Sequence, residues 1–297
     1  MTPLAPVTLA PVGPAFSPVA AGLWRLAEWA FTPAQLQGWV EHALSLGINT
    51  FDHADIYGGF TCEGLFGRWL KAHPSQRDAI RLVSKCGIKP VNAGFGWQVK
   101  HYDSSAVHVV ASVERSLAEL GTDHLDLLLI HRPDPLMQAD ELAEAFGQLR
   151  QAGKVLHFGV SNFTPAQFAL LAARTPLVTN QLECSLLHTA PLFDGALDQC
   201  QQERCRPMFW SPLAGGRLLQ AASHPVAALL REMAVERGVA VSTLALAWLL
   251  TLPCGPVPVI GSRRLASLDE AHAAVSLRLD RQSWFRLLEA ARGQEVA

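Results

Sequence analysis

The chain has 297 residues, and 24 lysines and arginines face 26 aspartates and glutamates, so its formal net charge is −2. No basic stripe is present, which argues against nucleic acid as a partner, and no apolar run reaches the roughly 18 residues that a membrane span needs. The proline-rich N-terminal segment lacks the basic residues of a secretory signal, and the six cysteines form no C-x-x-C pair. We therefore expect a cytoplasmic protein with reduced thiols and without a metal site.

The predicted elements alternate between strands and helices. Residues 7–16 indicate a small hairpin ahead of the main fold, and the apolar run 19–24 predicts a first strand. Thr32 is a good N-cap for a helix that Gly47 ends, and a strand starts at Asn49. Further strands are predicted at 81–87, 125–131, 155–160, 177–183, 207–210 and 256–260. Further helices are predicted at 65–70, from about 103 to 121, and at 139–151, 165–173, 192–203, 226–237, 242–251, 265–273 and 281–292.

This alternation predicts the fold class. Regular strand–helix repetition calls for a parallel sheet, and eight such units in 297 residues favour a closed (β/α)₈ TIM barrel over an open sheet. We expect one domain over 1–297, with the short N-terminal hairpin as a cap and extra helices at the C-terminus. No G-x-G-x-x-G follows any predicted strand, so a Rossmann-type site is not supported.

Four polar residues lie where predicted strands end, which is the catalytic face of such a barrel. Asp52 ends the second barrel strand, Tyr57 follows it in a glycine-containing loop, and Lys85 and His131 end the next two strands. A lysine is rarely buried without a partner, so Lys85 should pair with Asp52 on the neighbouring strand. Asp52 and Tyr57 alone would fit a capped strand end equally well, whereas four such residues at one rim indicate an active site.

The chemistry that this set suits is reduction of a carbonyl group. The carbonyl oxygen gains negative charge as it accepts hydride, so it needs a proton donor and hydrogen-bond stabilisation. A tyrosine has a pKa near 10, and we expect the Lys85 ammonium, held by Asp52, to lower the pKa of Tyr57. His131 would orient the carbonyl or donate a second hydrogen bond.

Six short motifs, spread in order over nearly the whole chain, resemble the aldo-keto reductase family, with most likeness to a bacterial YdhF-like branch. They are 51–58 (FDHADIYG), 83–85 (VSK), 129–133 (LIHRP), 158–162 (FGVSN), 180–181 (NQ) and 210–213 (WSPL). The resemblance implies a catalytic tetrad of Asp52, Tyr57, Lys85 and His131, with Tyr57 as the general acid. It also implies a small-molecule carbonyl substrate, NADPH as the preferred cofactor with NAD possible, and a monomer or weak homo-oligomer.

The same resemblance implies where the cofactor binds. Ser161, Asn162 and Gln181 match the positions that hold the nicotinamide carboxamide, and Trp210 matches the aromatic residue that stacks on the ring. The other implied cofactor-binding residues are Trp24 at the first strand end, Ser211, Leu213 and Gly215 over the pyrophosphate, and Gly261, Ser262, Arg263 and Glu270 at the adenosine end.

Two departures from the family pattern affect the choice between NADP and NAD. The family often has an arginine five residues after the serine at 262, where this chain has Ser267, and it often has Glu-Asn where this chain has Glu270 and alanine. A guanidinium suits the 2′-phosphate of NADP, and Arg263 or Arg264 would have to supply it.

Two other functions fit parts of the sequence. Some barrels of this family hold NADPH and turn over slowly as regulatory subunits, which gives a sensor or regulatory protein as the alternative. A metal-dependent hydrolase would use Asp52, His53, Asp55 and His131, but the other strand ends offer few metal ligands. The glycine-containing segment 88–102, with Trp97, is a candidate wall of the substrate pocket.

Overall fold

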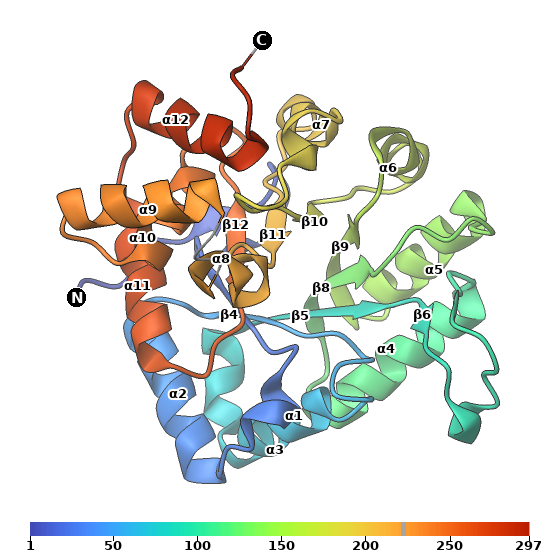
Figure 1. The fold of residues 1–297 in the computed structure, drawn as a ribbon. Coiled ribbons are helices and arrows are strands. Elements are labelled where there is room, and N and C mark those ends of the chain that lie inside the picture. Colours follow the sequence, from blue (N-terminus) through green and yellow to red (C-terminus); the bar gives the residue numbers. More distant parts are fainter. Residues whose placement is uncertain (221–223, 297) are drawn as a thin grey trace.

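The computed structural model describes residues 1–220 and 224–296, and in this part of the chain eight parallel strands close into a barrel (Figure 1). Each barrel strand pairs with the barrel strands before and after it in the chain, and the last closes onto the first. The predicted (β/α)₈ fold is confirmed. The strands are β3 (Ala20–Gly22), β4 (Thr50–Asp52), β5 (Arg81–Cys86), β8 (Leu125–Ile130), β9 (Val155–Ser161), β10 (Asn180–Glu183), β11 (Met208–Trp210) and β12 (Val257–Ile260).

Helices surround the barrel as a ring (Figure 1). They begin and end where the local sequence dictates. The Thr32 side chain and the Gln35 side chain form a reciprocal capping box at the start of α2, and Gly121 ends α4 in the left-handed conformation. The helices are α1 (Leu26–Trp29), α2 (Pro33–Ser45), α3 (Cys62–Ala72), α4 (Ala106–Leu120), α5 (Ala139–Gln151), α6 (Pro165–Ala172), α7 (Ala196–Gln202), α8 (Arg217–Gln220), α9 (Pro225–Glu236), α10 (Val241–Leu250), α11 (Leu265–Ser276) and α12 (Arg281–Arg292).

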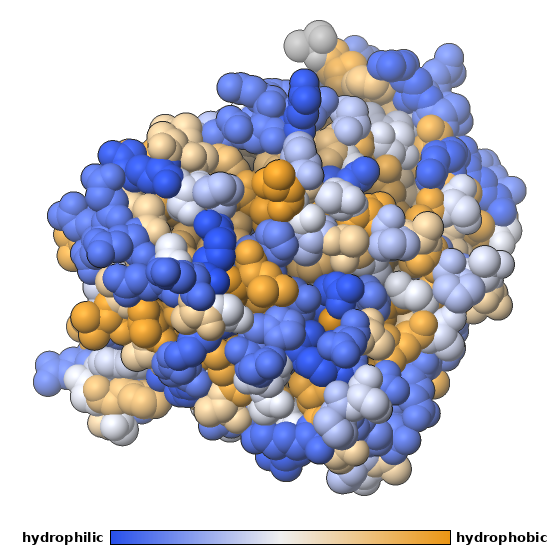
Figure 2. Space-filling view, turned by 180° about the vertical axis from the view of Figure 1, so that it is seen from behind, coloured by the Kyte–Doolittle hydropathy of each residue, from blue (hydrophilic) through white to orange (hydrophobic). Residues whose placement is uncertain are grey.

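The apolar core lies between the strands and this ring. Every residue of β8 is buried, as expected for a strand covered on both faces. The helix α10 is also buried over most of its length, which explains why its sequence is almost continuously apolar. On the face shown in Figure 2, hydrophilic residues surround small apolar patches.

The expected N-terminal hairpin is present. Its strands β1 (Val7–Thr8) and β2 (Ala15–Phe16) are antiparallel, and Leu9 and Phe16 are fully buried. The hairpin leads directly into β3, so it covers the end of the barrel where the strands start. This arrangement closes the barrel at the end opposite the strand termini that carry Asp52, Lys85 and His131.

Several predicted boundaries were wrong. The segment 88–102 is not an open loop, because β6 (Ile88–Lys89) and β7 (His101–Tyr102) pair as a hairpin around a short 3₁₀ turn. The helix predicted from about 103 begins at Ala106 with Ser105 as its N-cap, and α3 is longer than the predicted 65–70. The short helices α1 and α8 were not predicted, since neither carries an apolar repeat long enough to signal a helix.

Two later elements begin after their predicted starts. The strand predicted from 177 starts at Asn180, which pairs with Val160 of β9. The helix predicted from 192 starts at Ala196, after a 3₁₀ turn at Ala190–Leu192. Over residues 1–220 and 224–296, no single helix has the length and apolar character to cross a membrane, and the pair α9 and α10 passes that test only together, with a 101° bend between them.

Candidate active site

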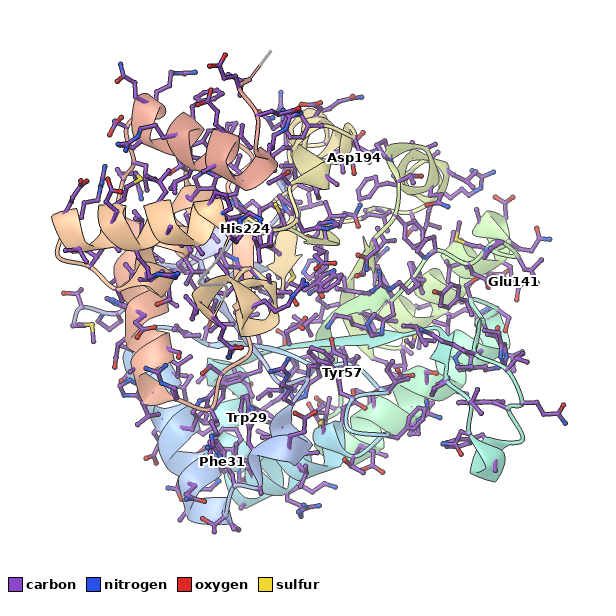
Figure 3. The ribbon with its side chains drawn as sticks, viewed as in Figure 1. Trp29, Phe31, Tyr57, Glu141, Asp194 and His224 are labelled. Atoms are coloured by element: carbon purple, nitrogen blue, oxygen red, sulfur yellow. The ribbon has the colours of Figure 1, made fainter. Side chains whose placement is uncertain are left out.

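A cavity of about 660 Å³ opens at the end of the barrel where the strands terminate. It takes residues from the ends of the strands and from the loops after them, and Figure 3 shows Tyr57 toward the middle of the ring. Of the residues predicted for the site, Lys85 and Arg263 do not line the cavity. Those that do are Trp24, Asp52, Tyr57, His131, Ser161, Asn162, Gln181, Trp210, Ser211, Leu213, Gly215, Gly261, Ser262 and Glu270.

Lys85 lies behind the cavity wall, and its side chain is fully buried. Its ammonium donates to Asp52 Oδ2 at 2.7 Å, to the backbone carbonyl of His53 at 2.7 Å and to Tyr57 Oη at 3.1 Å. An ammonium has three N–H donors, so these three bonds use all of them. The hydroxyl of Tyr57 accepts from Lys85, and its own O–H therefore remains available as a donor.

Asp52 is held at both oxygens. Oδ2 accepts from Lys85, while Oδ1 accepts from the side-chain amide of Gln181 at 2.8 Å. The residue is 2% exposed, so its charge depends on these two partners rather than on water. The structure thus gives Gln181 a contact that the sequence did not predict: its amide nitrogen fixes the carboxylate that holds Lys85.

The net pKa shift of Tyr57 is opposite to the one predicted. Burial of the phenol raises the pKa of Tyr57 above its usual value of 10.0, and this outweighs the lowering by the Lys85 ammonium. The expected direction of the Lys85 contribution was right, but the burial that opposes it could not be measured from the sequence. Tyr57 consequently holds its proton at neutral pH in this structure, as a proton donor must.

His131 lies beside Tyr57, and the two ring centroids are 5.9 Å apart in an edge-on arrangement. Burial and the nearby Lys85 ammonium lower the pKa of His131 well below its usual value, so its imidazole is neutral at physiological pH. A neutral imidazole still carries one N–H donor. His131 can therefore donate a hydrogen bond to a carbonyl oxygen without first being protonated.

On the opposite side of the cavity, a chain of hydrogen bonds joins the residues expected to hold a nicotinamide. The indole N–H of Trp210 donates to Asn162 Oδ1 at 3.0 Å, and the Asn162 amide donates to Ser161 Oγ at 2.7 Å. Ser161 Oγ in turn donates to the backbone carbonyl of Gln181 at 2.9 Å. These bonds fix Trp210 at the end of β11, where its ring lines the cavity.

The loop after β11 is folded tightly against the cavity. Ser211, Ala214, Gly215 and Gly216 all have positive φ angles, so the peptide planes reverse direction within six residues. A side chain at Gly215 would meet the guanidinium of Arg25 at 3.7 Å, which shows that the loop after β3 lies next to this one. Positive-φ turns present consecutive backbone N–H groups that suit an anion such as a pyrophosphate.

At the far end of the cavity, Glu270 accepts from Ser242 Oγ at 2.5 Å and lies 3.7 Å from the Arg264 guanidinium. Ser262 donates to Ser267 at 3.0 Å, so the serine found where the family often has arginine contributes to the wall. Arg264, rather than Arg263, lines the cavity. Two adjacent arginines cannot be told apart by sequence, because which of them faces inward depends on the backbone after β12.

Three further cations line the cavity and were not singled out from the sequence: Arg25, Lys100 and Arg132. Arg25 lies over the ring of Trp24 at 5.0 Å, and Arg132 lies over Trp210 at 5.4 Å. Arg132 directly follows His131 at the end of a strand, and this position could have identified it from the sequence as a residue of the site. Lys100 gave no such signal, because only the β6–β7 hairpin brings it to the cavity.

The predicted pocket wall at 88–102 is only partly right. Ile88 and Lys100 line the cavity, whereas Trp97 stacks on Phe95 at 4.6 Å outside it.

The metal hydrolase alternative gains no support from the geometry. Asp52 turns to Lys85 and His53 packs against Phe66, and among the described residues no group of three or more metal-binding side chains is close enough to hold an ion.

The barrel fold agrees with comparisons to known proteins. The Aldo/keto reductase family profile matches residues 18–292, and the chain belongs to this family. It is thus an NAD(P)H-dependent oxidoreductase that acts on carbonyl compounds.

Individual relatives cover nearly the whole chain. The oxidoreductase YdhF of Escherichia coli is 50% identical, over 98% of both chains. A 6-dehydroglucose reductase of Agrobacterium fabrum is 47% identical, over 95% of this chain and 96% of its own. A crystal structure of a thermostable aldo-keto reductase with the inhibitor epalrestat has the same fold, with a TM-score of 0.80 at 24% identity, over 97% of this chain and all of that one.

Proposed function

We propose that this protein reduces aldehydes or ketones to alcohols with NADPH, and that Tyr57 is the general acid. The observation that carries the proposal is that the three N–H groups of the Lys85 ammonium are all used in hydrogen bonds, to Asp52, His53 and Tyr57. Because Lys85 donates to the Tyr57 oxygen, the phenolic proton is left for another acceptor, and Tyr57 lines the cavity where a carbonyl oxygen would bind.

Each tetrad side chain then has a separate role. Tyr57 transfers its proton to the carbonyl oxygen as negative charge develops there, and the Lys85 ammonium stabilises the phenolate that remains. Asp52, fixed by Gln181, keeps Lys85 charged and in place. The neutral His131 donates a hydrogen bond to the same carbonyl oxygen and orients it.

The residues around the cavity fit a nicotinamide dinucleotide. When bound, this cofactor supplies the hydride. Trp210 offers a flat ring, Asn162 and Gln181 offer amide groups, and the positive-φ loop after β11 offers backbone N–H groups for a pyrophosphate. For the adenosine end we propose Gly261, Ser262 and Glu270, with Arg263 or Arg264 taking the 2′-phosphate that distinguishes NADPH from NADH.

For the substrate we propose an oxygen-rich aldehyde, such as one derived from a sugar. The name of the Agrobacterium relative identifies 6-dehydroglucose as its substrate. In this chain Arg25, Lys100 and Arg132 line the cavity, and within the described residues none of them has a hydrogen-bond or ion-pair partner. Guanidinium and ammonium groups only donate hydrogen bonds, so they suit a substrate that presents several oxygen acceptors.

The alternative is a barrel that binds NADPH and turns over slowly as a sensor. The two functions separate in a single-turnover experiment, in which oxidation of bound NADPH is followed at 340 nm after mixing with a reactive aldehyde. The enzyme should oxidise its bound NADPH once the aldehyde is added. Tight NADPH binding without oxidation would support the sensor.

Replacing Tyr57 by Phe tests the acid assignment. Tyr57→Phe should lower carbonyl reduction by about 10²- to 10⁴-fold, the usual contribution of a general acid, while NADPH affinity stays nearly unchanged. The chain contains two tyrosines, so Tyr102→Phe is a matched control that should keep wild-type turnover. Undiminished turnover in Tyr57→Phe would contradict the assignment.

A further inference from the structure

One buried carboxylate in the catalytic loop has no role in the chemistry described above. Asp55 lies two residues before Tyr57, is 3% exposed and does not line the cavity. Its backbone N–H donates to the carbonyl of Lys85 at 3.0 Å, which ties it to the strand of the catalytic lysine. Its side chain accepts from Arg115 Nη2 at 3.3 Å, and within the described residues its other oxygen has no hydrogen-bond partner.

Arg115 belongs to α4, outside the barrel, and its guanidinium touches two separate segments of the active-site rim. It lies 5.3 Å from the ring centre of Phe60 and 6.0 Å from that of Phe95. Phe60 is in the same loop as Tyr57, while Phe95 is in the turn of the β6–β7 hairpin. Figure 1 shows the segment after β6 projecting from the barrel next to α4.

The loop that carries Tyr57 needs such a support. Gly58, Gly59 and Phe60 all have positive φ angles, and Phe60, at +70°, is not a glycine. A non-glycine residue persists in this conformation only where its surroundings hold it. Phe60 also packs against Phe95 at 5.2 Å and against Trp97 at 6.0 Å, so the loop and the hairpin form one aromatic cluster.

The hairpin in turn supplies part of the substrate wall. Ile88, in β6, and Lys100, next to β7, both line the cavity beside Tyr57. Movement of the hairpin relative to the Tyr57 loop would therefore change the cavity where the substrate binds. Arg115 contacts both the hairpin and the Tyr57 loop, and the Asp55 carboxylate pairs with its guanidinium.

We propose that Arg115 and Asp55 are positioning residues for carbonyl reduction, which together hold the β6–β7 hairpin against the loop that carries Tyr57 and so shape the substrate side of the cavity. This inference rests on the proposed function, because it is read out through the carbonyl substrate. Neither side chain takes part in the proton transfer, and neither is placed at the cofactor wall.

The ion pair between Asp55 and Arg115 depends on pH near neutrality. Burial and the Glu63 carboxylate raise the pKa of Asp55 to about 7, against the lowering effect of Arg115. Asp55 is thus charged above about pH 7 and neutral below it, so its attraction for Arg115 weakens as the pH falls through that value. The titratable and charged groups around the pair are Glu63 on α3, Glu119 and His108 on α4, Lys85 and Cys86 on β5, Lys89 on β6, and Asp103.

Most of these neighbours do not titrate in an assay range of pH 6 to 8.5. Burial lowers the pKa of His108 to about 4, the Lys89 and Ser105 contacts lower that of Asp103 to about 2, and burial raises that of Cys86 well above its usual value. Burial also raises the pKa of Glu63, which accepts a hydrogen bond from Ser84 at 2.5 Å. Glu63→Gln is therefore the control that separates its titration from that of Asp55.

The test compares steady-state kinetics of the wild type with Arg115→Met and Asp55→Asn. We expect each variant to raise KM for the carbonyl substrate by roughly five- to tenfold, as loss of a cation–aromatic and ion-pair contact would, with kcat within about twofold and the Kd for NADPH unchanged. Since both changes break one contact, the double variant should be no worse than the more affected single variant. Arg150→Met, which removes a similar guanidinium lying 5.1 Å from Phe158, is the matched control and should leave KM unchanged.

The pH dependence is the readout that a merely structural role would not move. KM of the wild type should rise as the pH falls from 8 to 6. KM of Glu63→Gln should also rise, but at lower pH, because the Glu63 carboxylate no longer raises the pKa of Asp55. KM of Asp55→Asn should be high and nearly flat. Unchanged KM in Arg115→Met, additive effects in the double variant, or the wild-type pH slope in Asp55→Asn would each overturn the proposal.

If the Asp55 or Arg115 variants fail to fold, Phe95→Leu addresses the same contact from the surface, because Phe95 is 46% exposed. We expect it to raise KM without changing NADPH affinity, and an unaltered KM would overturn the proposal. A wild-type protein that oxidises no NADPH with any aldehyde would instead refute the proposed function, so the two failures are distinguishable.

Discussion

Replacing Lys85 by Met tests the buried ion pair on which the active site depends. The Lys85 side chain is fully buried and that of Asp52 is 3% exposed, so neither charge is hydrated. Met is close to Lys in length and has no charge. In Lys85→Met, Asp52 would keep only its bond from Gln181 while its charge stayed buried. Loss of one partner of a buried pair costs about 3–5 kcal/mol, and we expect the free energy of unfolding at pH 7 to fall by about that amount.

A double variant tests whether the uncompensated charge of Asp52 causes this loss of stability. In Lys85→Met with Asp52→Asn, no charge remains in the site, so the loss of stability should shrink to about 1–2 kcal/mol.

Urea unfolding followed by tryptophan fluorescence measures these differences, because the chain contains eight tryptophans. Lys154→Met is the control, since Lys154 pairs with Glu114 at the surface and should contribute at most about 1 kcal/mol. Equal losses in the single and double variants would refute the reasoning, because the uncompensated Asp52 charge would then not be the source. A loss below about 1 kcal/mol in Lys85→Met would refute it as well.

Three more predictions concern the cofactor, the substrate and stability in acid. Arg264→Ala should weaken NADPH more than NADH, and comparison with Arg263→Ala by cofactor titration shows which arginine holds the 2′-phosphate; equal loss of both cofactors in both variants would remove that role. Arg132→Met should raise KM for glyceraldehyde more than for propanal, and an equal rise would argue against an oxygen-rich substrate. Burial lowers the pKa of His53 to about 3, so the unfolded chain binds its proton first and stability falls as the pH drops below about 6.5. His53→Leu should therefore reduce the slope of unfolding free energy between pH 6 and 5 by about 1.4 kcal/mol per pH unit, and an unchanged slope would contradict this.

The sequence by itself was sufficient for the architecture and for which residues gather at one rim. Parallel strands linked by helices all end at the same side of a barrel, so chain order alone brings Asp52, Lys85 and His131 together. The pairing of Lys85 with Asp52 also followed from sequence, because a lysine at the end of an apolar strand requires a nearby anion. These inferences need only the order of the elements and the rule that buried charges are paired.

Only the tertiary structure decided how the site is balanced. Burial raises the pKa of Tyr57 and the Lys85 charge lowers it, and burial has the larger effect. Both effects depend on distances that no local sequence pattern contains. The tertiary structure also decided that Arg264 rather than Arg263 lines the cavity, and that Gln181 donates a hydrogen bond to Asp52, 129 residues away in the sequence. Arg115 is the clearest case: on α4 its sequence context is that of an exposed helix residue, and its contacts with Asp55, Phe60 and Phe95 exist because the loop after β4 and the β6–β7 hairpin pack against one guanidinium. Periodicity and motifs fix where an element runs and which way its end faces, whereas the energy of a buried charge is a sum over everything packed around it.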